Sequence, residues 1–377
     1  MRLLWIEVKD FRNHPDTRLQ VPPGLSVAVG GNGEGKTNLL EAAFYLLSLS
    51  SPRASSDLPL VRDGATAAYL RGEVEGLEGR ALVEVEVRGV GANRIQVNRS
   101  PVRRRRDLRK HVRAVFFSPG DLDIVLGNPD ARRGFLDEVV VSLWPVRDSL
   151  ARAYDRALRQ RNRLLKEWEG RGAPPELDAW DQELVAGGSA LTRARAEAAA
   201  RLAPRAGEEF RALAAYGLEV RYAPSVDAGE TGRPVEEVFG ERLAARREDE
   251  LIRRVTLVGP HRDDLELAVR DLTARSFASH GEAWAAALSL RLGQASAVAE
   301  ETGRPPVLLL DDPFPGLDPV RQARLAGRVA GRGQTLMSVA DDLHVPDEAE
   351  AVWEILGGQV SVRSGSVRSG SGRSGED

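Results

Sequence analysis

The sequence predicts an α/β fold that is interrupted by a long helical insertion. Strand-like segments alternate with turns over residues 1–115 and return after residue 255. From about residue 130, apolar residues recur at three-to-four spacing, which is typical of amphipathic helices. We therefore expect a discontinuous α/β domain of residues 1–120 and 255–360, split by an all-helical second lobe of residues 121–254.

The first part of the α/β domain is expected to hold one helix among several strands. The later strands follow one another closely, so an antiparallel hairpin sheet is added to the α/β arrangement. The expected strands are Leu3 to Val8, Leu25 to Val29, Tyr69 to Val74, Ala81 to Arg88, Arg94 to Val97 and Ala114 to Phe117.

The insertion is expected to consist of long helices. An apolar stripe runs along residues 150–168, Ala173-Pro174-Pro175 breaks that helix, and a second helical run extends from Glu176 to about Ala215. These two runs are expected to fold back as an antiparallel pair. A third helix around Val235 to Arg253 returns the chain to the α/β domain.

The second part of the α/β domain contains further strand-like segments and ends before a low-complexity tail. The segments are residues 256–258, 265–269, 306–312 and 335–339. From Ser361 the chain repeats Val-Arg-Ser-Gly-Ser units without apolar periodicity, so residues 361–377 are expected to be disordered.

Composition excludes several classes of protein. With 377 residues, 42% of them hydrophobic, the chain is long enough to bury a real core. No apolar run reaches the roughly 20 residues that a membrane span needs, and the N-terminus resembles a strand instead of a secretion signal, so we expect a cytoplasmic protein without a membrane partner. Because the sequence has no cysteine, disulfides, thiolate zinc sites and cysteine nucleophiles are excluded.

The most specific motif is a glycine-rich loop that follows the strand at residues 25–29. It reads Gly-x4-Gly-Lys-Thr and leads into a helix-forming segment, the order that a phosphate-binding P-loop requires. Its backbone N–H groups and Lys36 suit phosphates, and the Thr37 hydroxyl suits Mg²⁺. The sequence therefore predicts ATP and Mg²⁺ binding through residues of this loop and the helix start, namely Gly30, Gly31, Asn32, Gly33, Glu34, Gly35, Lys36, Thr37 and Asn38.

A second part of the site is expected at the end of the apolar strand Val307 to Leu310. Asp311 would hold Mg²⁺ together with Thr37, and Asp312 would polarise the attacking water, so Lys36, Asp311 and Asp312 are the candidate catalytic residues. Acidic residues also end many ordinary strands, but the P-loop upstream favours the functional interpretation. Asp318 follows at a spacing that suits a loop between two nucleotide sites.

The segment Ser279-His280-Gly281-Glu282 allows two interpretations. Ser-x-x-Glu before a helical run is a capping box, which needs no ligand. A serine at a helix N-terminus can also bind a γ-phosphate that another subunit presents.

A local basic surface is expected despite the net charge of −3. Arg103, Arg104, Arg105 and Arg106 follow one another on a connection between two expected strands. Such a run is either simply solvated or a contact for DNA phosphates.

Together these segments resemble the ABC-type ATPase head of the RecF family of DNA-repair proteins. The resemblance extends from Leu3 to about Leu356. Its more specific motifs are Gly-x-Pro-x-x-Arg-Arg-x-Phe-Leu-Asp at residues 127–137 and Gly-Pro-His-Arg-Asp-Asp at residues 259–264. Further matches are Asp10-Phe11-Arg12-Asn13, residues 31–42, Phe117-Ser118-Pro119 and the segment from Asp311-Asp312 to Leu317-Asp318.

The resemblance implies an ABC-type head that forms an ATP-dependent homodimer and hydrolyses ATP as a slow, DNA-stimulated switch. It implies binding of double-stranded DNA or single/double-strand junctions, and cooperation with RecR and RecO in placing RecA at gaps. It places Arg12 and Asn13 at the nucleotide, and Ser279, Gly281 and Glu282 in a signature that contacts the nucleotide of the other subunit.

The sequence departs from the family pattern at several positions. Gly120 stands where an acidic residue is usual, His280 and Glu282 replace the usual glutamines, and Pro315-Gly316 replaces Ser-Glu. No glutamine lies in the expected lobe-joining loop, and His344 is too far beyond the strand at residues 335–339 to be assigned a role.

Two alternatives stay open. The protein could be an ATP-gated DNA clamp or scaffold in which hydrolysis is incidental, or an ABC ATPase subunit of another system. A transporter subunit would be expected to show Leu-Ser-Gly-Gly-Gln and a switch histidine, which this chain lacks, and the insertion is far too short for an SMC coiled coil.

Overall fold

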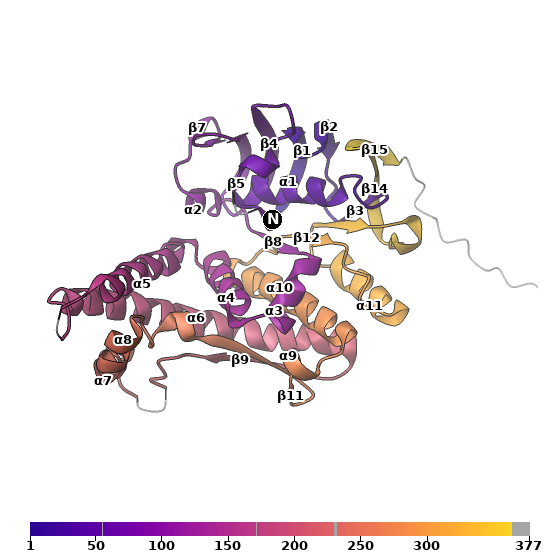
Figure 1. The fold of residues 1–377 in the computed structure, drawn as a ribbon. Helices are drawn as coiled ribbons and strands as arrows, with labels where there is room; N and C mark the ends of the chain where they lie inside the picture. The colour runs from indigo at the N-terminus through magenta and orange to yellow at the C-terminus, as the bar shows by residue number, and fades with distance from the viewer. Residues whose placement is uncertain (55, 171, 230–231, 364–377) are drawn as a thin grey trace, which may run out of the picture. The chain divides into compact units, whose positions relative to one another are not determined.

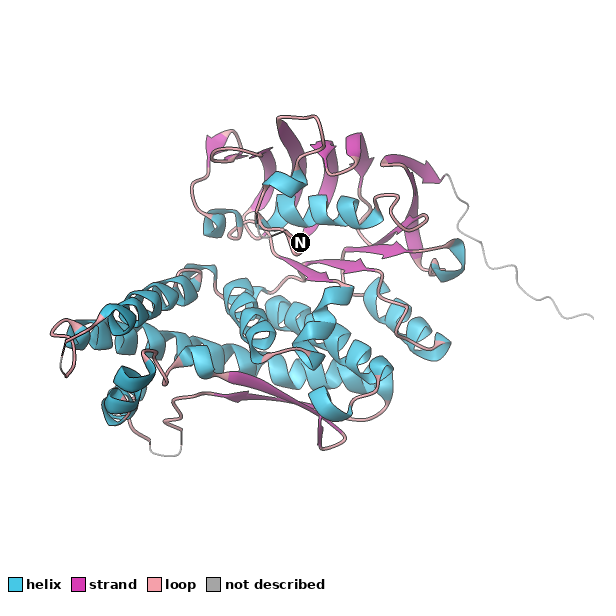
Figure 2. Ribbon diagram, viewed as in Figure 1, coloured by secondary structure: helices cyan, strands magenta, loops and turns pink. Residues whose placement is uncertain are grey.

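The computed structural model describes residues 1–54, 56–170, 172–229 and 232–363, and Figures 1 and 2 show its elements. The chain divides into two compact units. The first unit is Met1–Pro119 together with the chain from Val298 onward, and the second is Gly120–Ala297. Each unit has a hydrophobic core cluster of its own.

The first unit contains two six-stranded sheets. One is antiparallel, in the order β2-β1-β4-β5-β6-β7. The other, in the order β15-β14-β3-β13-β12-β8, is parallel except for β15. The strands of the antiparallel sheet are β1 (Arg2–Phe11), β2 (His14–Gln20), β4 (Ala67–Gly76), β5 (Gly79–Arg88), β6 (Arg94–Val97) and β7 (Ser100–Pro101). Those of the mainly parallel sheet are β3 (Leu25–Val29), β8 (Ala114–Phe117), β12 (Val307–Asp311), β13 (Thr335–Val339), β14 (Ala349–Leu356) and β15 (Gln359–Arg363).

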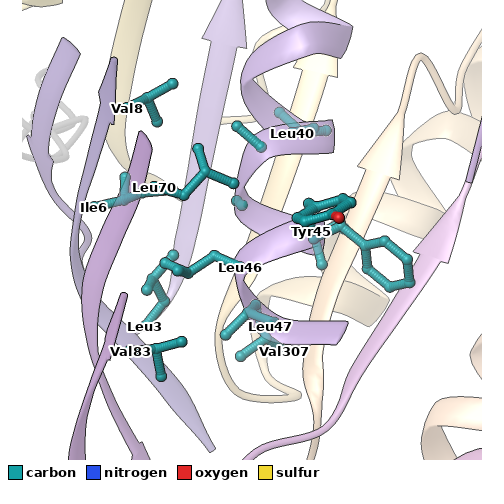
Figure 3. Packing of buried hydrophobic residues seen from close by; sticks show 14 of the residues in the cluster. Leu3, Ile6, Val8, Leu40, Tyr45, Leu46, Leu47, Leu70, Val83 and Val307 are labelled. Carbon is teal, nitrogen blue, oxygen red and sulfur yellow. The ribbon is translucent and has the colours of Figure 1, made fainter. Parts of the chain in front are cut away.

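The helix α1 (Lys36–Ser48) lies in the core of this unit. It contacts β1, β4 and β5 of the antiparallel sheet as well as β8, β12 and β13 of the parallel sheet. Leu46 lies beside Leu3 and Leu47 beside Val307, as Figure 3 shows. A helix buried on several sides needs apolar residues all round, and eleven of its thirteen residues are buried. Two short helices complete the unit, α2 (Arg105–Leu108) and α11 (Pro319–Ala330).

The second unit is mainly helical, as Figure 2 shows. In α5 (Leu150–Glu167) the buried residues Tyr154, Ala157, Arg161 and Leu165 recur every three or four positions, which gives the helix one buried stripe against α6 (Leu177–Ala214). The other helices are α3 (Leu122–Leu126), α4 (Pro129–Leu143), α7 (Val235–Ala245), α8 (Arg247–Arg253), α9 (Ala274–Phe277) and α10 (His280–Thr302).

This unit also contains a three-stranded sheet, so the expectation of an all-helical lobe was wrong in that respect. Its strands are β9 (Leu218–Ala223), β10 (Asp264–Val269) and β11 (Leu272–Thr273), in the order β11-β10-β9. Because β10 pairs with β9 over six residues, the chain after residue 255 stays in the second unit as far as Ala297 instead of returning to the first.

Two further expectations differ from the structure. Residues 256–258 form no strand, because side chains satisfy their backbone: Asn162 accepts from the Thr256 N–H at 2.8 Å and Glu250 from the Leu257 N–H at 2.7 Å. Ser361, expected to begin a disordered tail, lies in β15 with Val362 and Arg363, where β14 supplies a pairing edge. The rest of that predicted tail, residues 364–377, lies outside the described residues.

Candidate nucleotide-binding site

The P-loop begins where β3 ends. All five residues of β3 are buried, and parallel strands pair with it on both sides. The loop then exposes Gly31, Asn32 and Gly33 before α1 starts at Lys36. Gly33 has a φ of 85° and Gly35 a φ of 120°, which side chains other than that of glycine rarely adopt. The glycines therefore allow the tight path from strand to helix that the sequence predicted.

The side chain of Lys36 turns back into this loop. Its Nζ atom donates to the carbonyl oxygens of Gly30 at 2.6 Å and Gly31 at 2.8 Å. Burial lowers the pKa of Lys36, while the carboxylates of Asp312 and Asp311 oppose that shift. The structure thus holds a cation at the mouth of the loop, where a phosphate would need one.

Asp311 ends β12 next to the start of α1. Its Oδ1 atom accepts from the Thr37 hydroxyl at 2.8 Å and from the Ser338 hydroxyl at 2.7 Å. Burial raises the pKa of Asp311, and the two hydroxyl donors oppose the shift. A carboxylate and a threonine hydroxyl at this distance form a set of hard oxygen donors, which is the kind that Mg²⁺ prefers.

Asp312 follows in a left-handed backbone conformation with a φ of 46°. Its N–H donates to the Ser338 hydroxyl at 2.9 Å, so one β13 side chain holds both aspartates. Burial, and then the neighbouring charge of Asp311, raise the pKa of Asp312. A half-buried carboxylate with raised proton affinity has the character of a general base.

His344 is a site residue that the sequence analysis set aside. It lies in a short 3-10 helix, Asp342–His344, where its Nδ1 atom is 2.7 Å from Asp341 Oδ1 and its ring stacks on Phe314 with centroids 6.1 Å apart. His344 is among the groups that oppose the raised pKa of Asp312. The chain beyond β13 therefore returns toward Asp312, which distance along the sequence did not reveal.

Arg12 and a further arginine, Arg53, surround the buried carboxylate of Glu41 on α1. Arg12 binds Glu41 through two hydrogen bonds of 2.9 Å, and Glu41 is fully buried. Arg53 lies 3.7 Å from the same carboxylate, donates to Asn38 Oδ1 at 3.1 Å, and lowers the pKa of Asp311 against the effect of burial. Arg53 could not be predicted from the sequence, because its segment carries no motif.

The segment at residues 279–282, in the second unit, forms the capping box that the sequence allowed. The Ser279 N–H donates to Glu282 Oε2 at 2.8 Å, and the Glu282 N–H donates to the Ser279 hydroxyl at 3.3 Å. Glu282 also accepts from Tyr216 at 2.8 Å and pairs with Arg270. Its side chain is thus committed within the unit, whereas Ser279 remains exposed and Gly281 partly so.

Asp318 and the arginine run have simpler local environments. The Asp318 carboxylate caps α11 by accepting from the Arg321 N–H at 3.0 Å, and the residue is exposed. Arg103, Arg104 and Arg105 are exposed between β7 and β8, while Arg106 is half-buried in α2.

The two most specific sequence motifs meet in the second unit. Arg132 of α4 binds Asp264 at 2.6 and 2.9 Å, and Arg133 donates to the Asp263 carbonyl at 2.7 Å. Arg195 of α6 joins Asp137 to Asp263. These charged residues hold α4, α6 and the start of β10 together.

Gly120, which stands where the family usually has an acidic residue, is followed by a buried aspartate. The next residue, Asp121, forms two hydrogen bonds with the Arg291 side chain of α10, at 2.8 and 3.1 Å, and both residues are buried. The carboxylate that follows Phe117-Ser118-Pro119 is therefore present one position later and serves an internal ion pair.

The amino-acid sequence is similar to those of several bacterial proteins that share the same name. It is 39% identical to "DNA replication and repair protein RecF" of Cutibacterium acnes, with 96% of this chain and 98% of the relative covered. It is 42% identical to the proteins of that name from Frankia alni and Streptomyces avermitilis, covering 92% of this chain and 96% and 95% of those relatives. No protein-family model matches the chain.

Solved structures show the same likeness. A structure described as the recombination mediator protein RecF-ATPrS in the RecFOR pathway has a TM-score of 0.87 and 28% identity, covering 96% of this chain and 98% of that one. A RecF-ATP structure of the same pathway has a TM-score of 0.86 and 28% identity, covering 96% and 97%. The Smc head domain of Pyrococcus furiosus, at 15% identity and a TM-score of 0.56, covering 96% and 95%, shares the fold of an ABC-type ATPase head. Among the described residues, no helix is both long and apolar enough to cross a membrane.

Proposed function

The chain belongs to the RecF family of DNA replication and repair proteins, and from this premise we propose that it is an ATP-dependent DNA-binding protein of recombination and repair. In this proposal ATP binding makes two copies associate on duplex DNA or at single/double-strand junctions. Slow, DNA-stimulated hydrolysis then releases them. RecR, RecO and RecA are the proposed partners, and a DNA partner implies a cytoplasmic location.

One observation carries the proposal: the Thr37 hydroxyl lies 2.8 Å from Asp311 at the mouth of a glycine-rich loop that contains the Lys36 ammonium. This arrangement fits a magnesium–nucleotide complex, because it offers hard oxygens for the metal and N–H groups with a cation for the phosphates. Thr37 and Asp311 would hold Mg²⁺, whose charge offsets that of the phosphates when it is bound.

The proposed slow hydrolysis is supported by the residues next to the loop. Asp312 would accept a proton from water, and its raised pKa suits that role. Its side chain is one methylene shorter than glutamate, which shortens its reach. Ser338 positions Asp312 by accepting from its N–H.

The proposed dimer uses Ser279 and Gly281 rather than Glu282 toward the nucleotide of the other copy. Ser279 is exposed, whereas Glu282 is buried and held by Tyr216 and Arg270. Asp318 belongs to the same proposed interface as an exposed helix cap.

Sedimentation with and without ATP tests this function. We expect a monomer without nucleotide, a dimer with a non-hydrolysable analogue, and slow ATP turnover that rises when duplex DNA is added. Turnover indifferent to DNA, with an intact dimer, would favour the clamp or scaffold alternative. Absence of both nucleotide binding and dimers would contradict the proposal.

The DNA contact can be tested through the arginine run. Replacing Arg103, Arg104, Arg105 and Arg106 by Gln is expected to weaken binding to duplexes of any sequence and to flatten the salt dependence by about 0.9 log units per lost phosphate contact. Replacing four other exposed arginines by Gln removes the same charge and is the control: Arg152, Arg163, Arg221 and Arg246. Equal losses of DNA affinity in both variants would show that the DNA-binding surface lies elsewhere.

A further inference from the structure

Two turns hold the P-loop from the outside. The first turn joins β1 to β2 and contains Asn13. The strand β2 begins at the next residue, His14. The second joins β14 to β15 and consists of Gly357 and Gly358. Of these residues only Asn13 was assigned to the site from the sequence, and it was expected to contact the nucleotide.

The first turn binds two consecutive carbonyl groups of the loop. Asn13 Nδ2 donates to the Glu34 carbonyl at 2.9 Å, and His14 Nε2 lies 3.0 Å from the Gly35 carbonyl. The other end of the Asn13 amide is also engaged, since its Oδ1 atom accepts from Asn38 Nδ2 at 2.9 Å. The two ends of the Asn13 amide are thus engaged, one by the loop and the other by α1.

The second turn binds the same part of the loop. The Gly358 N–H donates to the Glu34 carbonyl at 2.9 Å, and the Gly357 N–H donates to the Glu34 carboxylate. The Glu34 carbonyl therefore accepts from both turns.

The turns approach each other so closely that only glycine fits. A Cβ atom on Gly358 would lie 2.0 Å from the Asn13 carbonyl oxygen, and Gly358 has a φ of 78°. On the neighbouring strand, a Cβ atom on Gly30 would lie 2.3 Å from the Ile355 carbonyl oxygen. A side chain at either position would push the hairpin and the loop apart.

We infer that Asn13, His14 and the Gly357–Gly358 turn are positioning elements of the nucleotide site. In a trans peptide the C=O and the following N–H point in opposite directions. When the Glu34 and Gly35 carbonyls are bound on the outside, the Gly35 and Lys36 N–H groups are fixed toward the inside, where phosphates bind. The inference rests on the proposed ATP site and adds that the C-terminal hairpin sets its shape.

This arrangement affects binding of the nucleotide rather than the chemical step. The N–H groups it orients face the phosphates, whereas Asp311 and Asp312 are held by Ser338 from β13. Loosening the turns should therefore raise KM for ATP and leave kcat nearly unchanged. A merely structural role would lower the melting temperature without separating the two constants.

The central test compares Gly358→Ala with Gly79→Ala in the full chain. Gly79, the first residue of β5, also has a positive φ, of 90°, but a Cβ atom there would meet nothing within 4 Å. Both variants therefore carry the backbone strain of alanine, and only Gly358→Ala intrudes on Asn13. We expect KM and Kd for ATP to rise about ten- to hundredfold in Gly358→Ala, with kcat within about twofold, and neither to change in Gly79→Ala.

Side-chain variants supply a second test that does not depend on a glycine. Asn13→Ala removes one donor to Glu34 and is expected to weaken ATP binding in the same way. Glu34→Ala removes only the carboxylate that accepts from the Gly357 N–H and is expected to weaken ATP binding less than Asn13→Ala does. ATP should also slow hydrogen exchange at the Gly357 and Gly358 amides.

The outcomes separate this inference from the proposed function. If wild type and Gly79→Ala do not bind ATP, the proposed function fails. If they bind ATP but Gly358→Ala and Asn13→Ala keep the wild-type KM, the positioning inference is overturned. Equal losses in both glycine variants would also overturn it, because generic backbone strain would then explain them.

Discussion

The aspartates of the nucleotide site differ from the buried charged residues of the second unit. Asp311 and Asp312 are buried or half-buried with raised pKa values, and within the described residues neither forms an ion pair, although the first unit also contains the pair of Arg12 with the buried Glu41. In the second unit Arg132, Arg195 and Arg291 are buried and bind carboxylates directly. A polar motif can thus have either of two roles: it can bind a ligand, as proposed for Asp311 and Asp312, or it can hold helices together, as the arginines of the second unit do.

Burial has a different consequence in each case. Lys36 only partly offsets the effect of burial on the pKa values of Asp311 and Asp312, so a bound metal would favour their charged forms. The second unit satisfies its buried charges internally, so removal of one partner leaves the other uncompensated. Changes in the first unit should alter ligand binding and turnover, whereas changes in the second should alter stability.

The largest expected effect is on turnover. Asp312→Asn removes the proposed base but leaves Asp311 for the metal, so the rate of ATP hydrolysis should fall by about 10²- to 10⁴-fold while ATP still binds and the dimer persists. Steady-state turnover beside sedimentation measures this. Wild-type turnover in Asp312→Asn would remove this residue from the mechanism.

A loss of stability of comparable size is expected from Arg195→Met in the second unit. The change leaves Asp263, which is 1% exposed, without its cation, and should lower the free energy of unfolding by about 3–5 kcal/mol. Arg193→Met on the same helix is the matched control, because its pair with Glu236 is exposed and should be worth about 0–1 kcal/mol. ATP affinity should be unchanged in both, and a loss of affinity in Arg195→Met would break the contrast between the units.

A pH effect on stability is expected from His261 in the second unit. Burial lowers the pKa of His261 from 6.5 to about 4, and its neutral ring accepts from the Tyr154 hydroxyl across 2.7 Å. Between those values the unfolded chain binds more protons, so stability is lost as pH falls from 6.5 toward 4, by at most about 3 kcal/mol. In denaturant melts across this pH range, the free energy of unfolding should depend less steeply on pH in His261→Gln than in the wild type. An equal dependence would assign the pH effect to other groups.

The smallest expected effects concern Ser279. Ser279→Ala should cost about 0.5–2 kcal/mol through loss of the helix cap, whatever the nucleotide. Ser279→Arg should leave ATP binding to the monomer intact but block ATP-driven dimerisation. A destabilised Ser279→Arg protein that still dimerises would leave only the capping role.

The sequence predicted the elements with strong local signals and missed those formed by distant contacts. The P-loop, β12 and the helices α5 and α6 follow from glycine spacing, an apolar run and three-to-four periodicity. The strand β2 carries mostly polar residues and exists because β1 provides an edge for it. β9 and β10, separated by forty residues, pair in a way that no local pattern reveals.

The same limit applies to the site. Lys36, Thr37 and Asp311 could be found from motifs, and the structure brings Thr37 and Asp311 together. No motif marks Arg53, Ser338 or His344. They could not be predicted because only the folded chain brings them near the aspartates. Arg12 binds Glu41, whose burial the sequence did not indicate, and its expected contact with the nucleotide stays a prediction.

The most direct test of the central claim is ATP affinity in Lys36→Met, measured by equilibrium titration beside a thermal melt. The ammonium contacts only loop carbonyls among the described residues, so its loss should change the melting temperature little. ATP binding and ATP-dependent dimerisation should be lost, because the cation facing the β- and γ-phosphates is gone. Wild-type affinity and dimerisation in this variant would contradict the assignment of the site.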